Sequence, residues 1–155
     1  MKIETTRFGT LDVDETKIVT MPHGMLGFPK SRRFVLFRHK EDSPFFWYQS
    51  VDESSLAFVM TRPCLIVADY HPDVKETSTM MGWKEDGSMY ELYVIVNIPK
   101  GTPEKMTANL IGPVLINPAA REAVQMIITE SPYSHRFPLL LSSRDPSSLE
   151  SFGTL

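Results

Sequence analysis

The most restrictive feature of this chain is that proline and glycine interrupt its apolar runs throughout. The sequence holds 12 prolines and 8 glycines in 155 residues. Short apolar runs between such breaks are typical of β-strands rather than of long helices. A chain of this length suits one domain. We therefore expect a single domain made mainly of short strands, with one or two short helices.

The predicted strands are rich in β-branched or aromatic residues and are bounded by turn-forming residues. Glu91–Ile98 is almost continuously apolar, which indicates a strand covered on both faces. Asn109–Ile116 contains Gly112-Pro113, and because proline lacks a backbone donor we expect this run to bulge or to lie at a sheet edge. The full set is Gly9–Val13, Lys17–Met21, Arg33–Phe37, Phe45–Val51, Leu56–Met60, Leu65–Val67, Glu91–Ile98, Asn109–Ile116 and Ala123–Ile128.

One segment, Pro72–Gly82, is predicted to be helical. Asp73 is placed to cap the helix with Glu76 three residues later, and Gly82 is placed to end it. A second short helix is expected within Thr102–Met106. Ala119–Ala123 has helical propensity, but its position between two strand-like runs favours a turn.

Four consecutive aromatic residues, Phe45 to Tyr48, lie within one predicted strand. Since side chains alternate between faces, Phe46 and Tyr48 are expected in the core while Phe45 and Trp47 face the other side. The alternative is exposure, for stacking on bases or anchoring an interface. Cys64 is expected to be a small buried apolar residue.

The sequence contains none of the common catalytic or ligand-binding patterns. The four histidines have no partner at zinc-site spacing, and the hydrolase and nucleotide-binding motifs are missing. Gly24-Met25-Leu26-Gly27 is predicted to be a chain reversal rather than a phosphate cradle. We therefore predict no enzyme activity, no catalytic residues, no metal and no cofactor.

Charge and targeting signals point to a soluble protein without direct nucleic-acid contact. The net charge is −3 and no basic face is apparent. The N-terminus has no apolar signal core, and no apolar run could span a membrane. A single cysteine cannot form an internal disulfide, which agrees with a reducing compartment. We expect a β domain over residues 1–141, followed by a flexible, serine-rich tail over residues 142–155.

The stretch Asn109–Ile128 joins two apolar runs by a short polar link and is the most informative part of the chain. Its distinctive residues suit turns and surface contacts rather than chemistry, which indicates a binding protein. They are Asn109, Pro113, Asn117, Arg121 and Gln125.

Several segments, in order, resemble the flagellar assembly factor FliW family over roughly residues 5–130. They are Thr6-Arg7-Phe8-Gly9 with Leu11; Pro22 to Phe28 and on to Arg33-Phe34-Val35-Leu36; Phe45 to Ser50; Leu56 to Met60; and Asn109-Leu110, Pro113, Ile116-Asn117, Arg121 and Gln125. Pro29 departs from the pattern, where an acidic residue is often expected, and this leaves the surface charge of that turn open.

The resemblance implies a cytoplasmic bacterial protein with a small single-domain β-barrel-like fold of short antiparallel strands. It also implies two mutually exclusive partners, the translational regulator CsrA and flagellin before export. While flagellin occupies the FliW-like protein, CsrA is free to repress flagellin mRNA. Once flagellin is exported, the freed protein binds CsrA and relieves repression, so it acts both as a CsrA antagonist and as a flagellin chaperone.

We hypothesise that a strand edge near Gly112–Asn117, with Arg121 and Gln125, contributes to a partner surface. The alternative is structural: Asn117-Pro118 makes a turn and Gln125 caps backbone groups. Two other functions remain open. One is a small-molecule-binding β-barrel, possibly related to an enzyme, with the aromatics at 45–48 and Trp83 lining a pocket. The other, binding of single-stranded RNA, is disfavoured by the negative charge.

Overall fold

The computed structural model describes residues 1–84 and 89–139, so the predicted tail at 142–155 lies outside the described residues. Within the described part, no helix has the length and apolarity needed to cross a membrane.

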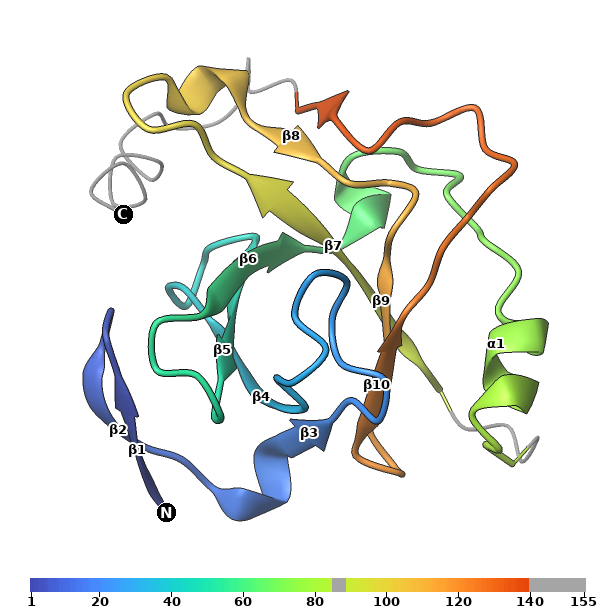
Figure 1. The fold of residues 1–155 in the computed structure, drawn as a ribbon. Coiled ribbons are helices and arrows are strands. Elements are labelled where there is room, and N and C mark those ends of the chain that lie inside the picture. Colours follow the sequence, from blue (N-terminus) through green and yellow to red (C-terminus); the bar gives the residue numbers. More distant parts are fainter. Residues whose placement is uncertain (85–88, 140–155) are drawn as a thin grey trace.

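A closed β-barrel forms the centre of the molecule (Figure 1). Its strands follow one another in the order β3 (Ile18–Thr20), β4 (Arg33–Arg38), β5 (Phe45–Ser50), β6 (Ala57–Thr61), β7 (Glu91–Asn97), β9 (Val114–Asn117) and β10 (Glu122–Gln125). The ring closes because β10 pairs with both β9 and β3. These pairings confirm the mainly β, barrel-like fold. The expectation of antiparallel strands holds except between β10 and β3, which are parallel where Glu122 faces Thr20.

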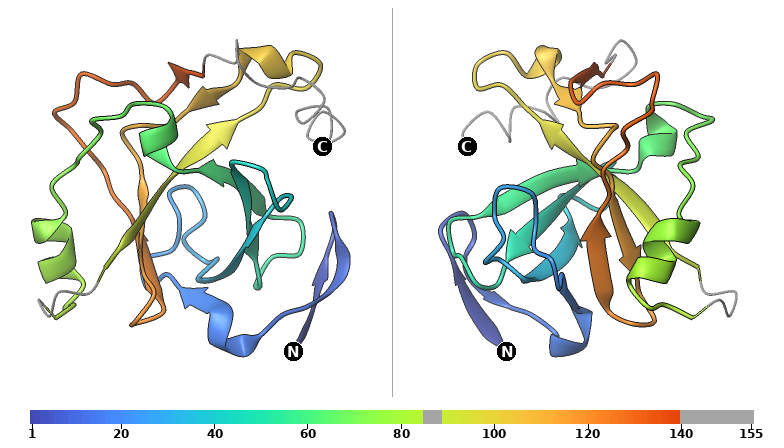
Figure 2. Two further views of the ribbon diagram at one scale, coloured as in Figure 1. Left: turned by 180° about the vertical axis from the view of Figure 1, so that it is seen from behind. Right: turned by 45° about the vertical axis from the view of Figure 1, so that its right-hand side comes forward.

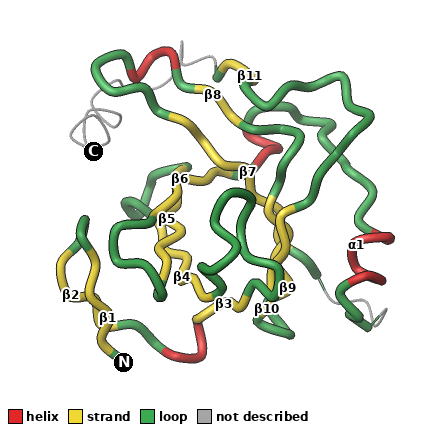
Figure 3. Tube along the Cα trace, viewed as in Figure 1, coloured by secondary structure: helices red, strands yellow, loops and turns green. Residues whose placement is uncertain are grey.

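The other elements surround the barrel (Figures 2 and 3). A separate hairpin is formed by β1 (Lys2–Thr5) and β2 (Gly9–Asp12), and β8 (Thr107–Ala108) and β11 (Phe137–Pro138) extend the main sheet beyond β7. The helix α1 spans Lys75–Met80, and 3-10 turns occur at η1 (Glu15–Lys17), η2 (Pro63–Leu65) and η3 (Pro103–Lys105).

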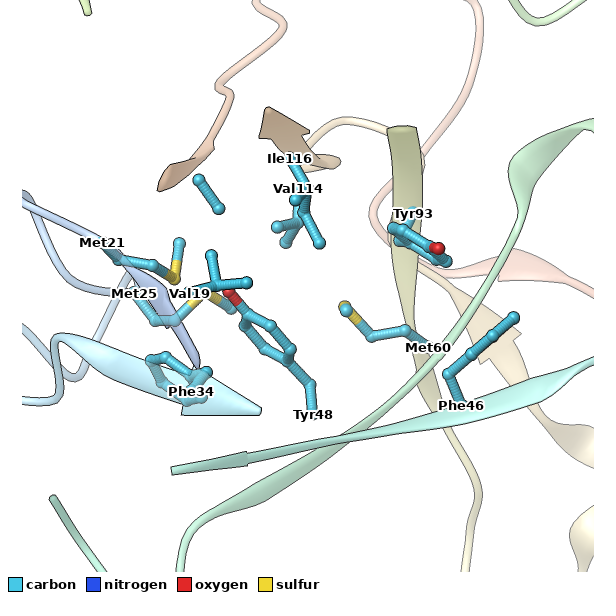
Figure 4. Packing of buried hydrophobic residues seen from close by; sticks show 11 residues of the cluster. Val19, Met21, Met25, Phe34, Phe46, Tyr48, Met60, Tyr93, Val114 and Ile116 are labelled. Carbon is cyan, nitrogen blue, oxygen red and sulfur yellow. The ribbon is translucent and has the colours of Figure 1, made fainter. Parts of the chain in front are cut away.

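Two apolar layers lie on the two faces of the barrel wall, and β5 belongs to both. Phe46 and Tyr48 face the barrel interior, where they pack with residues from the other barrel strands (Figure 4). Phe45 and Trp47 face outward into a second cluster with Val94 and Val96. Both predictions are confirmed: the aromatic run alternates between faces, and β7 is covered on both. Period-two alternation explains this, because each face of these strands meets its own layer.

The prediction of a strand at Leu65–Val67 is wrong. Pro63 begins the 3-10 turn η2, in which the amide of Ile66 donates to the Pro63 carbonyl at 2.9 Å. Pro63 is buried, whereas Cys64 is exposed. The prediction that Cys64 is buried is therefore also wrong, because the tight turn buries the proline and directs its neighbour outward.

The predicted edge position of Asn109–Ile116 is wrong as well. The strand begins only at Val114, after Gly112-Pro113, and it pairs with β10 on one side and β7 on the other. Barrel closure therefore uses both edges of β9, and a partner strand cannot add there.

The helix predicted within Pro72–Gly82 is present but short. The predicted capping by Asp73 and Glu76 is wrong, because Val74 is the N-cap and has no side-chain cap. Asp73 instead accepts a hydrogen bond from the Lys75 amide at 3.0 Å in the turn before the helix. Gly82 follows the helix with a φ of 72°, as predicted. The segment Thr102–Met106 contains η3 instead of an α-helix. The predicted turn before β10 is confirmed, while β1, β8 and β11 were missed because each is short or polar.

Candidate partner-binding surface

The turn between β3 and β4 is the first part of the site. Gly24 and Gly27 have φ values of 67° and 86°, in the left-handed region that glycine adopts without steric cost. Met25 and Phe28 form a bridge across the turn. The chain reversal predicted for Gly24–Gly27 is thus confirmed, and it places Leu26 at the tip, where 56% of the side chain is exposed.

An apolar groove of about 350 Å³ separates this turn from α1 and from the end of β10. Its side chains come from three distant parts of the sequence. They are His23, Met25, Leu26, Pro29, Met80, Val124, Gln125 and Ile127, together with Gly24 and Gly27. Leu26, Met80 and Ile127 are each more than half exposed. We call this surface the apolar groove.

Gln125 joins two walls of the apolar groove. Its Oε1 accepts a hydrogen bond from the Leu26 amide at 3.0 Å, and its Nε2 donates to the Gly112 carbonyl at 3.0 Å. Both ends of the side-chain amide are therefore engaged with backbone groups, as the structural alternative predicted. Its contribution to the groove is to hold the Leu26 turn beside β10.

Arg121 lies at a second, more polar opening. This opening has a volume of about 490 Å³ and is lined by Met1, Glu15, Ile18, Thr20, Arg33, Ala120, Arg121 and Glu122. Arg121 has a φ of 53°, which is uncommon for a residue with a side chain. Its carbonyl accepts from the Thr20 amide at 2.9 Å, so the backbone strain serves the closure between β10 and β3.

Asn117 is buried and belongs to neither opening. Its Oδ1 accepts a hydrogen bond from the Ala120 amide at 3.3 Å, which stabilises the turn between β9 and β10. The structure therefore separates the three sequence-predicted residues. Gln125 lies in the apolar groove, Arg121 lies at the polar opening, and Asn117 is the last residue of β9, next to the turn that leads to β10.

The sequence reasoning missed Leu26, Met80 and Ile127. The position of Leu26 between two glycines could have indicated its exposure, because a glycine-flanked turn leaves the side chain at its tip in solvent. Met80 lies within the predicted helix at Pro72–Gly82, and 60% of it is exposed. Ile127 was placed within a strand, but β10 ends at Gln125.

The aromatic residues that could have lined a ligand pocket are instead buried in the apolar clusters. Trp83 is buried among Leu115, Val124 and Met126, and its Nε1 donates to Glu122 at 2.9 Å. The residues at 45–48 are buried as well. Across the described residues, no three histidine, cysteine or acidic side chains are grouped as a metal site would need.

Comparison with known proteins shows which family this chain resembles in sequence. The family model described as FliW protein matches residues 2–139. The flagellar assembly factor FliW of Magnetococcus marinus is 41% identical over 146 residues, covering 92% of this chain and 87% of that protein. The protein of the same description from Syntrophus aciditrophicus is 35% identical over 140 residues, covering 90% of this chain and 88% of that protein.

A solved structure agrees with the sequence comparisons. The crystal structure of a flagellar assembly factor FliW superposes with a TM-score of 0.82 at 30% identity, covering 93% of this chain and all of that chain. The range matched by the family model, residues 2–139, includes the barrel, the hairpin and the turn beside the apolar groove. On these findings, the chain belongs to the FliW protein family.

Proposed function

We propose that this chain is a flagellar assembly factor that acts in the cytoplasm by binding other proteins, without chemistry of its own. The observation that supports this most is family membership over residues 2–139, together with relatives described as flagellar assembly factors. Its proposed partners are a CsrA-type RNA-binding regulator and flagellin. Each excludes the other by its bulk, since the two surfaces proposed below share no residue, so that flagellin translation follows flagellin export.

The apolar groove is the surface that we propose for flagellin. A filament subunit held before polymerisation has apolar surface that is buried only in the filament. Covering that surface requires a complementary apolar site. Leu26, Met80 and Ile127 supply such a site, because all three are more than half exposed around one groove.

The acidic side of the hairpin is the surface that we propose for the regulator. Glu4 and Asp12 are exposed on the hairpin, and Asp14 and Glu15 are exposed just after it. These four carboxylates outnumber the nearby cations, which are the Met1 amino group at 3.5 Å from Asp12, Lys2 opposite Asp12, and Lys17. Hydrogen bonds from Thr16 lower the pKa of Asp14, so this carboxylate stays charged to a lower pH than an ordinary aspartate does. A basic RNA-binding protein would be steered towards such a surface by its opposite potential.

Competition between purified proteins tests the exchange. The regulator is captured on the immobilised chain, and flagellin is then added in increasing amounts. Release of the regulator in proportion to bound flagellin is expected. Simultaneous retention of both partners, or capture of neither, would contradict the proposal.

A matched pair of variants tests the flagellin surface. Leu26→Asp places a charge in the apolar groove, whereas Leu65→Asp places the same charge at a similarly exposed leucine away from it. Leu26→Asp should weaken flagellin binding at least about tenfold, which corresponds to roughly 1.4 kcal/mol, and Leu65→Asp should not. Equal affinities, with circular dichroism showing folded proteins, would remove the groove from the flagellin site.

A further inference from the structure

Two arginines outside the apolar groove converge on one aromatic ring of the barrel. The guanidinium carbon of Arg38 lies 5.0 Å from the centroid of the Phe46 ring, and that of Arg62 lies 5.9 Å from the same centroid. Arg62 also lies 5.2 Å from the ring centroid of Tyr93. Both arginines are exposed, whereas Phe46 and Tyr93 are buried.

Strand register explains the convergence. Arg38 at the end of β4 is directly opposite Phe46 on β5, and Phe46 is opposite Met60 on β6. Since side chains two residues apart share a face, Arg62 follows Met60 on that face. Its Nη2 donates to the Tyr93 hydroxyl at 3.4 Å. The barrel itself therefore places both guanidinium groups against the same aromatic ring.

The cluster has more positive than negative charge. Within residues 1–84 and 89–139, neither Arg38 nor Arg62 forms an ion pair. The nearby carboxylate of Glu91 accepts from the Tyr93 hydroxyl at 2.8 Å. Burial and Glu91 raise the pKa of Tyr93, while Arg62 and Arg38 act to lower it, so both cations influence the same hydroxyl.

We propose that Arg38 and Arg62 form a binding site for a carboxylate of an acidic peptide segment in a partner protein. Both guanidinium groups lie over aromatic rings, which attract cations. The Nη1 group of Arg38 also donates to the Ser43 carbonyl at 3.3 Å, which fixes its direction. The remaining N–H groups at the guanidinium edges can make paired hydrogen bonds to a planar carboxylate.

The size and charge of the site favour a peptide over a nucleic acid. The chain has a net charge of −3, and a phosphate backbone would need a longer row of cations. A short acidic peptide needs only these two arginines.

This site is independent of the partner exchange proposed above, because it is formed by other residues. It would bind an acidic ligand, whereas the acidic hairpin would bind a basic protein. The test therefore uses a defined probe, a capped six-residue glutamate peptide, titrated into the full chain. Binding is followed by calorimetry and by the NMR signals of the arginine Nε–H groups. A capped glutamine peptide of equal length is the uncharged control, and a short oligouridylate tests the phosphate alternative.

The glutamate peptide should shift the Arg38 and Arg62 signals, and its affinity should fall at least about tenfold in the double variant Arg38→Gln, Arg62→Gln. Arg136→Gln removes the same charge from an exposed segment elsewhere and should leave the affinity unchanged. The double variant Arg38→Lys, Arg62→Lys keeps the charge and should lose part of the affinity, since ammonium groups cannot bind a carboxylate in the paired geometry.

Absence of binding to the wild-type chain, or equal binding by the Arg38→Gln, Arg62→Gln variant, would overturn the proposal. So would tighter binding of the oligouridylate than of the peptide. If the Arg38→Gln, Arg62→Gln variant fails to fold, the peptide titration of the wild-type chain still tests the site. Peptide-induced shifts of other NMR signals, without shifts of the Arg38 and Arg62 signals, would reject it.

Discussion

Gln125 and Leu26 are 99 positions apart in the sequence, yet the Gln125 side chain accepts a hydrogen bond from the Leu26 amide. The same side chain donates to the Gly112 carbonyl. One glutamine thus connects the β3–β4 turn, the segment before β9 and the end of β10. The shape of the apolar groove depends on this connection.

The first prediction concerns Gln125→Ala. Loss of both hydrogen bonds leaves the Leu26 amide and the Gly112 carbonyl without their partner, which should lower the free energy of unfolding by about 1–2 kcal/mol. Urea denaturation measures that change. Hydrogen exchange should also accelerate at the Leu26 amide but not at the Phe28 amide, which donates to Met25 within the turn. Equal acceleration at both would indicate general loosening instead.

The second prediction compares alanine at two glycines of the same turn. At Gly24 an added Cβ would lie 2.8 Å from the Pro29 backbone, whereas at Gly27 it would meet nothing within 4 Å. Both substitutions incur the left-handed backbone cost of about 1–2 kcal/mol. Gly24→Ala should destabilise clearly more, because the contacted backbone cannot move aside. Thermal unfolding measures the difference, and equal losses would contradict this account.

The third prediction compares two buried tyrosine hydroxyls. Among the described residues the Tyr48 hydroxyl has no hydrogen-bond partner, whereas the Tyr70 hydroxyl donates to the Leu110 carbonyl at 2.6 Å. Tyr48→Phe keeps the ring stacked on Phe34 at 4.4 Å and should leave stability unchanged or raise it. Tyr70→Phe should cost about 1–3 kcal/mol, since the Leu110 carbonyl loses its donor. A larger loss for Tyr48→Phe would reverse the interpretation.

The fourth prediction concerns acid stability and Asp52. Burial acts to raise the pKa of this carboxyl, but hydrogen bonds from Arg32 and Arg33 and the charge of Arg33 outweigh it and lower the pKa below 3.8. A lowered pKa means that the stabilisation is present above the unfolded value and is lost as the pH falls through the folded value. Asp52→Asn should be less stable at pH 7 by about 1 kcal/mol. The gap from wild type should begin to narrow near the unfolded-state pKa of about 4 and should close only below the lowered pKa of the folded protein. A gap that persists at low pH would exclude ionisation as its cause.

The fifth prediction separates the two roles of Arg121. Arg121→Gly removes the side chain and relieves the positive φ, whereas Arg121→Ala removes the side chain and keeps the strain. The glycine variant should therefore be the more stable by several tenths of a kcal/mol to about 1 kcal/mol. If the side chain contacts the regulator, calorimetry should show equal losses of affinity in both variants. Unchanged affinity in both would confine Arg121 to the turn.

The sequence by itself determined the local features. Proline and glycine spacing predicted short strands, alternation divided the aromatic run at 45–48 between two faces, and the glycine pair at 24 and 27 predicted a reversal. These features were predictable because neighbouring residues decide them. The order of the segments that resemble the FliW family also indicated the family correctly, since it depends on residue types along the chain alone.

Only the tertiary structure decided which strands close the ring and which side chains meet. Long-range pairing placed β9 between two neighbours instead of at an edge, and it brought Leu26, Met80 and Ile127 around one groove. It also brought Arg38 and Arg62 to one ring. Local propensity carries no information about such contacts, because they depend on strand register and barrel closure between segments that are far apart in the chain.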